Sequence, residues 1–586
     1  MQNVIILLQE MASEAIQKAF GAALSKELAL AEVSQSTQAQ FGHYQCNSAL
    51  KIAKALQKSP REAAEMIVSH FITLDAANEA IIAKLEIAGP GFINITLSQD
   101  YLAKELERIL SDPRLGIAPC APQRVIVEFS SPNVAKEMHV GHIRSTIIGD
   151  CLARVLEFLG HNVIRLNHIG DWGTQFGMLI THMRERHRDV LEGRRPTDLL
   201  SLMTWYKESK VRFDTEPEFK KQAQLQVVSL QSGHPESLKA WHLICDISRK
   251  GFQEIYDLLD VKLLERGESF YNPLLPKVVE ALEKKGLVTI SDGAKCIFME
   301  GFVSREGNPL PMIIQKADGG YNYDTTDMAA ILHRVREEKA ERIIVITDAG
   351  QSLHFQMLFK AAELAGFYDP RKVQLDHVAF GVVLGPDGKK FKTRSGETEK
   401  LIDLLLNAVT KAREILRERI EGASDEEIEQ MAQILGIDAV KYADLSCHRI
   451  KDYLFSYDRM LRFEGNTAAF LLYAYVRVQG IKRKIGKDLQ ALIEKAKVVL
   501  EHPTEIALAL HLRQFGETLA HVERELLPNR LTDYLYELAE KFHAFFRDCR
   551  VEGDEHEESR LLLCEATGRI LKQGLALLGL KTLDRM

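Results

Sequence analysis

The chain has 586 residues, of which 46% are hydrophobic and 27% are charged, enough for roughly three or four globular domains of about 150 residues each. Its formal net charge of −7 excludes a uniformly basic, polyanion-binding protein, so a surface for nucleic acid would have to be a local patch. The eight cysteines form no CxxC pair, and no apolar run is long enough for a signal peptide or a membrane span. We therefore expect a cytoplasmic protein with no structural zinc site and no contact with a membrane.

The two ends of the chain carry patterns of different kinds. Residues 1–115 combine helical periodicity with short strand-like runs, which predicts a small α+β domain. Pro119 and Pro122 mark a joint after it. Helical periodicity then dominates residues 401–586, with few glycine or proline breaks, and predicts an all-α bundle.

Between these ends, residues 116–400 alternate strand-like and helical segments. The apolar, β-rich runs lie at 125–129, 163–167, 342–347 and 375–384. Such alternation predicts an α/β domain with a doubly wound parallel sheet of the Rossmann-like, nucleotide-binding type. Between about 185 and 315 the sequence predicts charged helices in place of regularly spaced strands, and we interpret this stretch as an insertion in the domain.

The strongest chemical pattern follows the first strand of the predicted sheet. Small residues come after the strand, a helix is expected to begin near Gly141, and His139 and His142 lie three residues apart. A glycine lets phosphate approach the backbone, a helix N-terminus favours anions, and the two imidazoles can face one ligand. This strand-loop-helix context predicts a nucleotide site. The alternative is half of a metal site, but further zinc ligands at a suitable spacing are not evident nearby.

The residues of this loop resemble a known family. Residues 139–142 (His-Val-Gly-His) resemble the HIGH motif of class I aminoacyl-tRNA synthetases, and residues 167–177 resemble the arginyl-tRNA synthetases in particular. The run 168–171 (His-Ile-Gly-Asp) is closer to HIGH in letters but follows the second strand, so we interpret it as a loop beside the ATP or the amino acid. The similarity runs from residues 41–47 to 578–580 and implies a catalytic domain of the HUP type.

The resemblance also places a mobile ATP loop of the KMSKS type at residues 385–396. The match is degenerate, because Thr393 stands where the second lysine is usual, and a plain solvated turn is an equally good reading for each lysine of the loop. The resemblance implies that Lys136 supplies the missing charge. It assigns catalysis to Lys136, His139, His142, Lys390, Lys392 and Arg394, and ATP binding to Lys136, His139, Gly141, His142, Phe391, Lys392 and Thr393. The GxxxxGK[ST] spacing of a P-loop is not present here.

A guanidinium substrate needs carboxylates in bidentate geometry, with an aromatic or hydroxyl group holding its plane. Asp327 lies four residues after Tyr323, so on a helix both side chains would face one pocket. Asp324 is the rival carboxylate, unless it caps that helix. By resemblance, the arginine-binding residues are Glu128, Ser130, Asn133, Tyr323, Asp327 and Gln351, with Asn133 and Gln351 at the α-amino and carboxylate end.

The resemblance implies an arginine–tRNA ligase that uses ATP with Mg²⁺ as a substrate complex, without zinc or a bound organic cofactor. It further implies that the partner is tRNA(Arg) and that the enzyme is a monomer that needs bound tRNA to activate arginine. The domain of residues 1–115 is expected to contact the tRNA elbow, and the domain of residues 401–586 is expected to bind the anticodon. In the latter, aromatic residues from Phe470 to Tyr475 precede cations from Arg477 to Lys487, a pattern that suits RNA but also an ordinary solvated helix face. Two alternatives remain: another class I adenylate-forming ligase, and a non-catalytic tRNA-binding relative.

Overall fold

A computed structural model describes residues 3–36, 38–74, 79–385, 387–389, 391, 400–495 and 497–586. The chain divides into two compact units. The first comprises Met1–Pro119, Arg462–Ala576 and Lys581–Met586, and the second comprises Cys120–Leu461 and Leu577–Leu580. This division groups residues 401–461 with the second unit, whereas the sequence suggested a domain boundary at residue 401.

The second unit contains a five-stranded sheet in the order β12–β11–β5–β6–β7, with every neighbouring pair parallel. Its strands are β5 (Arg124–Glu128), β6 (Asn162–Asn167), β7 (Leu264–Glu265), β11 (Arg342–Asp348) and β12 (Gln374–Phe380). The central strand β5 is buried along most of its length, as expected where helices cover both faces of a parallel sheet. The parallel α/β fold predicted from the sequence is confirmed.

Helices connect the strands of this sheet. They are α5 (Val140–Leu159), α6 (Thr174–Arg186), α12 (Tyr323–Arg336) and α13 (Ser352–Ala365). Helix α5 follows β5 and approaches its end closely, because a Cβ at Gly149 would lie 2.1 Å from Cγ of Phe129. Gly160 ends the helix in the left-handed conformation, with φ of 106°. The small residue at Gly149 thereby lets the middle of α5 pack against the residue that follows the central strand, and Gly160 ends the helix.

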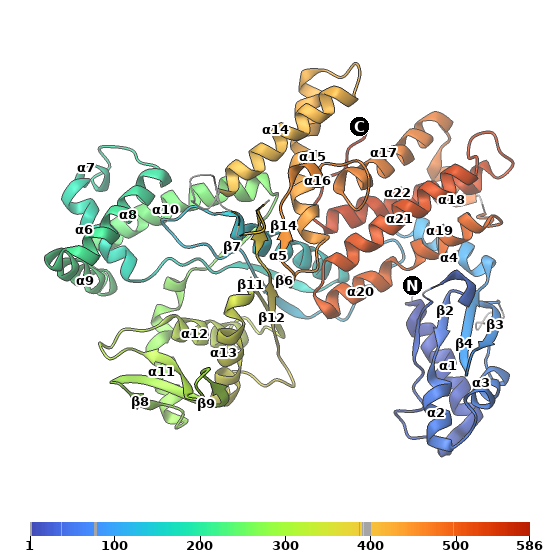
Figure 1. The fold of residues 1–586 in the computed structure, drawn as a ribbon, viewed down its shortest axis with the longest axis horizontal. Helices are drawn as coiled ribbons and strands as arrows, with labels where there is room; N and C mark the ends of the chain where they lie inside the picture. The colour runs from blue at the N-terminus through green and yellow to red at the C-terminus, as the bar shows by residue number, and fades with distance from the viewer. Residues whose placement is uncertain are drawn as a thin grey trace. The chain divides into compact units, whose positions relative to one another are not determined.

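The predicted insertion lies between β6 and β11 and contains both helices and a small sheet. Its helical part is α7 (Arg188–Leu191), α8 (Leu199–Thr215), α9 (Pro217–Gln231), α10 (Pro235–Leu258), the 3₁₀ helix η3 (Glu268–Leu274) and α11 (Leu275–Lys284). The strands β8 (Thr289–Ser291), β9 (Ala294–Val303) and β10 (Pro309–Gln315) form an antiparallel sheet, drawn near α11–α13 in Figure 1. This sheet was not expected. Its strands are largely exposed or half-exposed, so their apolar periodicity is weak.

A helical hairpin completes the second unit. It consists of α14 (Leu401–Arg419) and α15 (Asp425–Leu445), followed by the short α16 (Tyr457–Met460) and by strand β14 (Tyr453–Leu454), which pairs with β13 (Val383–Leu384). The buried Arg144 of α5 forms an ion pair with Asp444 of α15 at 3.2 Å and donates a hydrogen bond to the carbonyl of Gly381 at 2.8 Å. These contacts join the hairpin to the sheet beside the end of β12.

The first unit begins with the predicted α+β domain. An antiparallel sheet has the order β1–β2–β4–β3, with β1 (Val33–Gln35), β2 (Tyr44–Cys46), β3 (Ile82–Ala88) and β4 (Phe92–Leu97). Its helices are α1 (Val4–Phe20), the 3₁₀ turns η1 (Gly21–Ala23) and η2 (Ala39–Phe41), α2 (Ser48–Leu56), α3 (Pro60–Ser69) and α4 (Gln99–Ser111). The blue part of Figure 1 shows α1–α3 beside this sheet.

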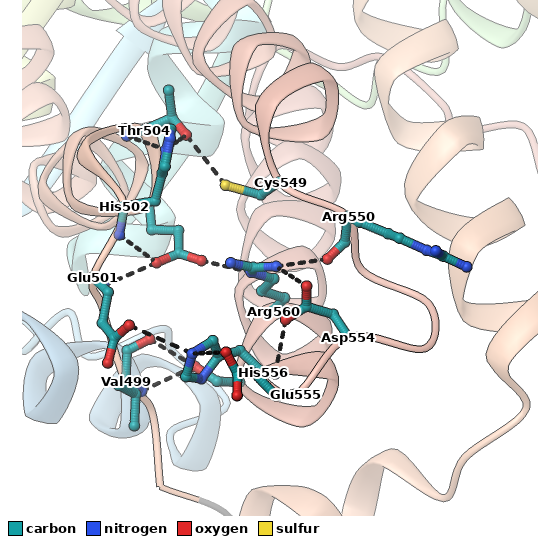
Figure 2. Close-up of polar contacts among 12 residues, drawn as sticks. Val499, Glu501, His502, Thr504, Cys549, Arg550, Asp554, Glu555, His556 and Arg560 are labelled. Carbon is teal, nitrogen blue, oxygen red and sulfur yellow. Dashed lines mark hydrogen bonds and ion pairs between the residues drawn. The ribbon is translucent and has the colours of Figure 1, made fainter.

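The rest of the first unit is the predicted helical bundle. It contains α17 (Ala468–Ile485), α18 (Leu489–Lys495), α19 (Pro503–Arg513), α20 (Phe515–Glu525), α21 (Asn529–Asp548) and α22 (Glu557–Leu577). The guanidinium of Arg560 on α22 pairs with Glu505 at 2.7 Å and with Asp554 at 2.9 Å. Figure 2 shows Arg560 beside Asp554 and Arg550. Among the described residues, no helix combines the length and the apolar character needed to cross a bilayer.

Candidate active site

The second unit contains a cavity of about 880 Å³ at the carboxyl ends of β5 and β11, beside the start of α5. The chain leaves β5 for β6 on one side, whereas β11 lies on its other side, so the cavity sits where the strand order reverses. Its walls include most of the residues expected to bind substrates: Glu128, Ser130, Asn133, His139, Gly141, His142, Tyr323, Asp327, Gln351 and Phe391. The structure thus brings together residues that lie far apart in the sequence.

The loop that follows β5 holds an unusual backbone conformation. Ser130, Ser131 and Ala135 have φ values of 73°, 48° and 61°, a region that costs a non-glycine residue about 1–3 kcal/mol. Hydrogen bonds hold it: the Ser131 N–H donates to Oδ1 of Asn167 at 3.0 Å, and the Ser130 hydroxyl lies 2.8 Å from that of Tyr256. The side chain of Ser130 is therefore engaged in shaping the loop that carries the histidine motif.

The two histidines cap helix α5. Nδ1 of His139 accepts a hydrogen bond from the Gly141 N–H at 3.0 Å, and Nδ1 of His142 accepts one from the His139 N–H at 3.1 Å. Burial lowers the pKa of His142 to about 4, and burial together with the charge of Lys136 lowers the pKa of His139. Both rings are therefore neutral near pH 7, and because each Nδ1 is an acceptor, each Nε2 carries the proton. The motif presents two uncharged N–H donors.

Two residues expected near the ATP phosphates, Lys136 and Phe391, lie differently with respect to the cavity. Lys136 is exposed and is not among the cavity-lining residues, and its Nζ lies 5.7 Å from the ring centroid of Tyr206 on α8. Phe391 of the predicted ATP loop lines the cavity and packs edge-on against Phe455 at 5.2 Å. The remaining expected residues of that loop, Lys390, Lys392, Thr393 and Arg394, lie outside the described residues.

Acidic residues gather in another part of the cavity wall. Asp327, on the first turns of α12, is joined by Glu268 of η3, a residue that the sequence analysis missed. Burial, reinforced by the charges of Asp327 and Asp171, raises the pKa of Glu268 to about 8. Glu268 follows β7, the strand next to β6, and its place at the carboxyl edge of the sheet could have been recognised only if that two-residue strand had been predicted.

The rival Asp324 is buried and does not line the cavity, and Asn322, rather than Asp324, is the N-cap residue of α12. Between Asp324 and Asp327 stands His354 of α13, whose Nδ1 lies 3.2 Å from the first carboxylate and whose Nε2 lies 2.7 Å from the second. Burial lowers the pKa of His354, but the hydrogen bonds and charges of the two aspartates outweigh it and raise the pKa to about 9. His354 is a second cavity residue that the sequence analysis missed.

Glu128 was expected to bind the guanidinium of the substrate, but it forms an ion pair with the guanidinium of Arg334. Its Oε2 lies 2.5 Å from Nη1 of Arg334 on α12, and both side chains are largely buried. Asn133 and Gln351 are exposed residues of the cavity wall. Gly170 provides the space for Asn133, because a Cβ at Gly170 would lie 2.2 Å from Oδ1 of Asn133.

One group in this unit has metal-ligand chemistry. The ligand atoms of His182, His187 and Glu208 lie within 4.8 Å of one another, and Nε2 of His182 is 3.1 Å from the Glu208 carboxylate. Arginines crowd the group, since Arg195 contacts His187 at 3.3 Å and Arg212 contacts His182 at 3.5 Å. Positive charge so close opposes a cation, and we assign no metal there.

The cations expected on and just after α17 are mostly paired with acids of their own unit. Lys482 pairs with Glu565 at 2.6 Å, and Lys487 pairs with Glu557 at 2.9 Å. Arg477 differs, because its guanidinium lies over the rings of Tyr473 and Phe546, at 4.8 and 5.0 Å from their centroids. The surface around Arg477 is thus aromatic and cationic, while much of the predicted basic patch is neutralised.

Comparison with known proteins now decides the family. Residues 105–457 match the family described as "tRNA synthetases class I (R), catalytic domain", residues 471–586 match the "DALR anticodon binding domain", and residues 7–97 match the "Arginyl tRNA synthetase N terminal domain". The chain belongs to the arginyl-tRNA synthetase family. The resemblance of residues 139–142 and 167–177 is thereby confirmed.

Relatives of this arginyl-tRNA synthetase family member match it from end to end. The arginine–tRNA ligase of Protochlamydia amoebophila is 62% identical over 556 residues, which cover 95% of this chain and 94% of the relative. That of Nostoc sp. is 52% identical and covers 99% of both chains. The crystal structure of arginyl-tRNA synthetase from Plasmodium falciparum superposes with a TM-score of 0.87 at 34% identity and covers 100% of both chains. The Thermus thermophilus arginyl-tRNA synthetase, at 24% identity and a TM-score of 0.79, shares the fold and likewise covers 100% of both chains.

Proposed function

We propose that this chain activates L-arginine with ATP and transfers the arginyl group to the terminal ribose of tRNA(Arg). The observation that carries the proposal is a single cavity with two chemically distinct ends. One end has two neutral imidazole donors at a helix N-terminus, and the other has the carboxylates of Asp327 and Glu268. The first suits a polyphosphate, and the second suits a guanidinium.

The nucleotide end is built on the start of α5. The Nε2–H groups of His139 and His142 donate to phosphate oxygens, and the helix N-terminus adds its partial positive charge. Mg²⁺ enters as part of the ATP substrate complex. Lys136 reaches the phosphates by leaving the ring of Tyr206, and Lys390, Lys392 and Arg394 supply further positive charge, with Thr393 and Phe391 in the same loop.

At the arginine end, Asp327 and Glu268 receive the guanidinium, and Tyr323 lies at the edge of this site. Asn133 and Gln351 hold the α-amino and carboxylate groups. The Ser130 hydroxyl and the Glu128 carboxylate are engaged with Tyr256 and Arg334, so these two residues shape the arginine pocket more than they bind its charge.

The reaction then needs no covalent intermediate with the protein. The arginine carboxylate attacks the α-phosphate, the bond to the β-phosphate oxygen breaks, and pyrophosphate leaves with arginyl-adenylate remaining. A ribose hydroxyl of the tRNA next attacks the acyl carbon, its proton is lost, and AMP leaves. The protein contributes orientation and stabilisation of the charge on the phosphorus centre.

The first unit, together with the helices after residue 401, serves tRNA in this proposal. Residues 1–115 contact the elbow and residues 401–586 the anticodon arm, where Tyr473 and Phe546 are 38% and 40% exposed and flank Arg477. Exposed aromatic faces with a cation between them suit unstacked bases. We place the enzyme in the cytoplasm, as a monomer that binds tRNA before it activates arginine.

Pyrophosphate exchange tests the proposal. The full-length protein is assayed with each standard amino acid, with and without tRNA(Arg). Exchange with arginine alone, and only when tRNA is present, is the expected result. Exchange with a different amino acid would support another class I ligase, and no exchange with any amino acid would support a non-catalytic tRNA-binding relative.

A further inference from the structure

His354 occupies an unusual position in the cavity, because each of its ring nitrogens meets a carboxylate. Nδ1 lies 3.2 Å from Oδ1 of Asp324, and Nε2 lies 2.7 Å from Oδ2 of Asp327. An ionised carboxylate only accepts hydrogen bonds, so both nitrogens must donate, and a ring that donates twice is an imidazolium. The geometry therefore places a positive charge of the protein between two aspartates of α12.

The other groups that face His354 leave this charge in place. On α12, the ring of Tyr323 packs edge-on at 5.2 Å beside the two aspartates. On β12, burial together with the charge of Arg449 lowers the pKa of His377 to about 4, so that ring is neutral. These neighbours offer no stronger cation for the aspartate pair.

Two further groups reach the aspartate pair from other elements. His168, after β6, lies 3.8 Å from the other oxygen of Asp327. Burial, reinforced by the charge of Asp327, raises the pKa of the nearby Glu268. His354 is thus the side chain that bonds both aspartates directly, in a pocket where further acid is close by.

Asp327 is proposed to bind the guanidinium of the substrate. The His354 imidazolium therefore occupies the carboxylate to which the substrate cation must bind. We infer that His354 is an internal counter-ion of the arginine pocket, which holds Asp327 in the arginine-free enzyme and releases that carboxylate, with loss of a proton, when the guanidinium binds. This inference rests on the proposed function for the placement of the guanidinium. His354 acts through Asp327 and is a positioning residue.

The proton balance of this exchange is simple. The free enzyme holds one proton on His354, arginine enters as a cation, and the complex retains the arginine charge while the His354 proton passes to solvent. The neutral ring keeps one N–H, which remains directed to Asp324. A neutral isostere such as citrulline brings no charge to replace the imidazolium. The exchange of His354 for the substrate cation at Asp327 therefore also selects a cationic substrate.

The exchange makes arginine binding depend on pH with a defined sign. Protons compete with arginine for Asp327 through His354, whose pKa in the arginine-free enzyme is raised to about 9. Apparent arginine affinity should therefore increase as pH rises from 7 to 9, with the KM for ATP unchanged. Glu268, with its pKa raised to about 8, shifts affinity in the same direction, so an experiment must separate the two groups.

Calorimetry separates them. Arginine is titrated into full-length E268Q enzyme, free and with tRNA(Arg) bound, at pH 7.5 in phosphate and in Tris, whose different ionisation enthalpies report the number of protons released. E268Q should release about one proton per arginine bound, and the double variant E268Q/H354Q should release none. Glutamine at 354 retains a neutral N–H donor toward Asp327, so a purely structural role would be largely preserved.

The possible outcomes are distinct. The inference is overturned if the double variant releases a proton on binding arginine. It is also overturned if E268Q releases none, or if the wild type releases none. Each of these results leaves the proposed function standing. The wild-type measurement requires no folding of a variant. If the wild type fails to exchange pyrophosphate with arginine at all, the proposed function fails instead. In the expected case, H354Q lowers the KM for arginine at pH 7, because no His354 proton has to leave, and weakens the pH dependence of that KM, while the KM for ATP stays within about twofold of wild type.

Discussion

Nη1 of Arg334 lies 2.5 Å from Oε2 of Glu128, and the two side chains are 3% and 10% exposed. The pair connects the carboxyl end of the central strand to α12, the helix that also carries Tyr323 and Asp327. Glu128 therefore meets a guanidinium that belongs to the chain itself. This pair positions the helix that forms the acidic wall of the cavity.

The first prediction concerns this pair. Glu128→Gln removes one charge and leaves Arg334 buried without its counter-ion, which costs about 3–5 kcal/mol when a buried pair is broken. We expect the free energy of unfolding, measured by urea denaturation, to fall by that amount. Glu128→Gln with wild-type stability and a selectively raised KM for arginine would show instead that Glu128 serves the substrate directly.

The second prediction is that a substitution at Asp327 affects arginine binding more than it affects stability. Its side chain is 22% exposed and faces the cavity, so Asp327→Asn removes a charge-assisted contact to substrate with a smaller effect on stability. We expect the KM for arginine in pyrophosphate exchange to rise at least about tenfold, while the KM for ATP stays near wild type. Asp318→Asn, on the exposed turn before α12, is the matched control and should change neither constant. Equal effects of Asp327→Asn on both substrates would remove Asp327 from the guanidinium site.

These two acids show what the sequence could and could not provide. The interval from Tyr323 to Asp327 and the interval from His139 to His142 are local, so helical geometry alone predicts that each pair shares a face. The burial of Glu128 against Arg334 depends on how α12 packs on β5, two segments about two hundred residues apart. Local periodicity contains no information about such a contact.

The same reasoning explains the residues that were missed. Glu268 enters the cavity from a short 3₁₀ helix behind a two-residue strand, and His354 enters from a different helix than the aspartates that it contacts. The doubly wound sheet was predictable because β5, β6, β11 and β12 are apolar runs that alternate with helices. The small β8–β10 sheet was not, because its half-exposed strands lack a strong hydrophobic alternation.

The histidine motif makes a further prediction, because His142 has two separable roles. Its Nδ1 caps α5, and its Nε2–H is proposed to contact phosphate. Glutamine and glutamate both complete a capping box at this position, so His142→Gln and His142→Glu should fold with nearly wild-type stability. Pyrophosphate exchange should fall about 10²–10³-fold or more for His142→Glu, which places negative charge at the phosphates, and less for His142→Gln. Equal activities of the two variants would contradict a phosphate contact.

The ion pair of Arg560 with Glu505 in the bundle gives a prediction about pH and stability. Burial raises the pKa of Glu505, but hydrogen bonds from Arg560 and from the backbone of residues 501 and 502 outweigh it, and the net pKa is lowered. A carboxyl group with a lowered folded pKa stabilises the protein above its unfolded pKa of about 4.3, and this stabilisation is lost as pH falls through the folded pKa. Arg560 keeps its ion pair with Asp554, so Glu505→Gln should destabilise the bundle by about 1.5–3 kcal/mol at pH 7 and should show a weaker decline in stability below pH 4.5 than the wild type. Parallel acid-denaturation curves for the two proteins would contradict this assignment.

The surface around Arg477 gives the last prediction, which concerns tRNA alone. Phe546 is 40% exposed, and Arg477 lies 5.0 Å from its ring centroid, so truncating Phe546 removes a stacking face with little loss of core packing. A base stacked on an aromatic side chain contributes about 1–3 kcal/mol, so Phe546→Ala should raise the KM for tRNA(Arg) by about 5–150-fold while the KM values for arginine and ATP, measured at saturating tRNA, stay unchanged. Leu225→Ala, which removes a 61% exposed apolar side chain on α9, outside the ranges proposed to contact the tRNA elbow and anticodon arm, is the control and should leave tRNA affinity unchanged. If Phe546→Ala charges tRNA with wild-type affinity, the aromatic face lies outside the tRNA contact, and the anticodon arm must bind elsewhere on the helical domain.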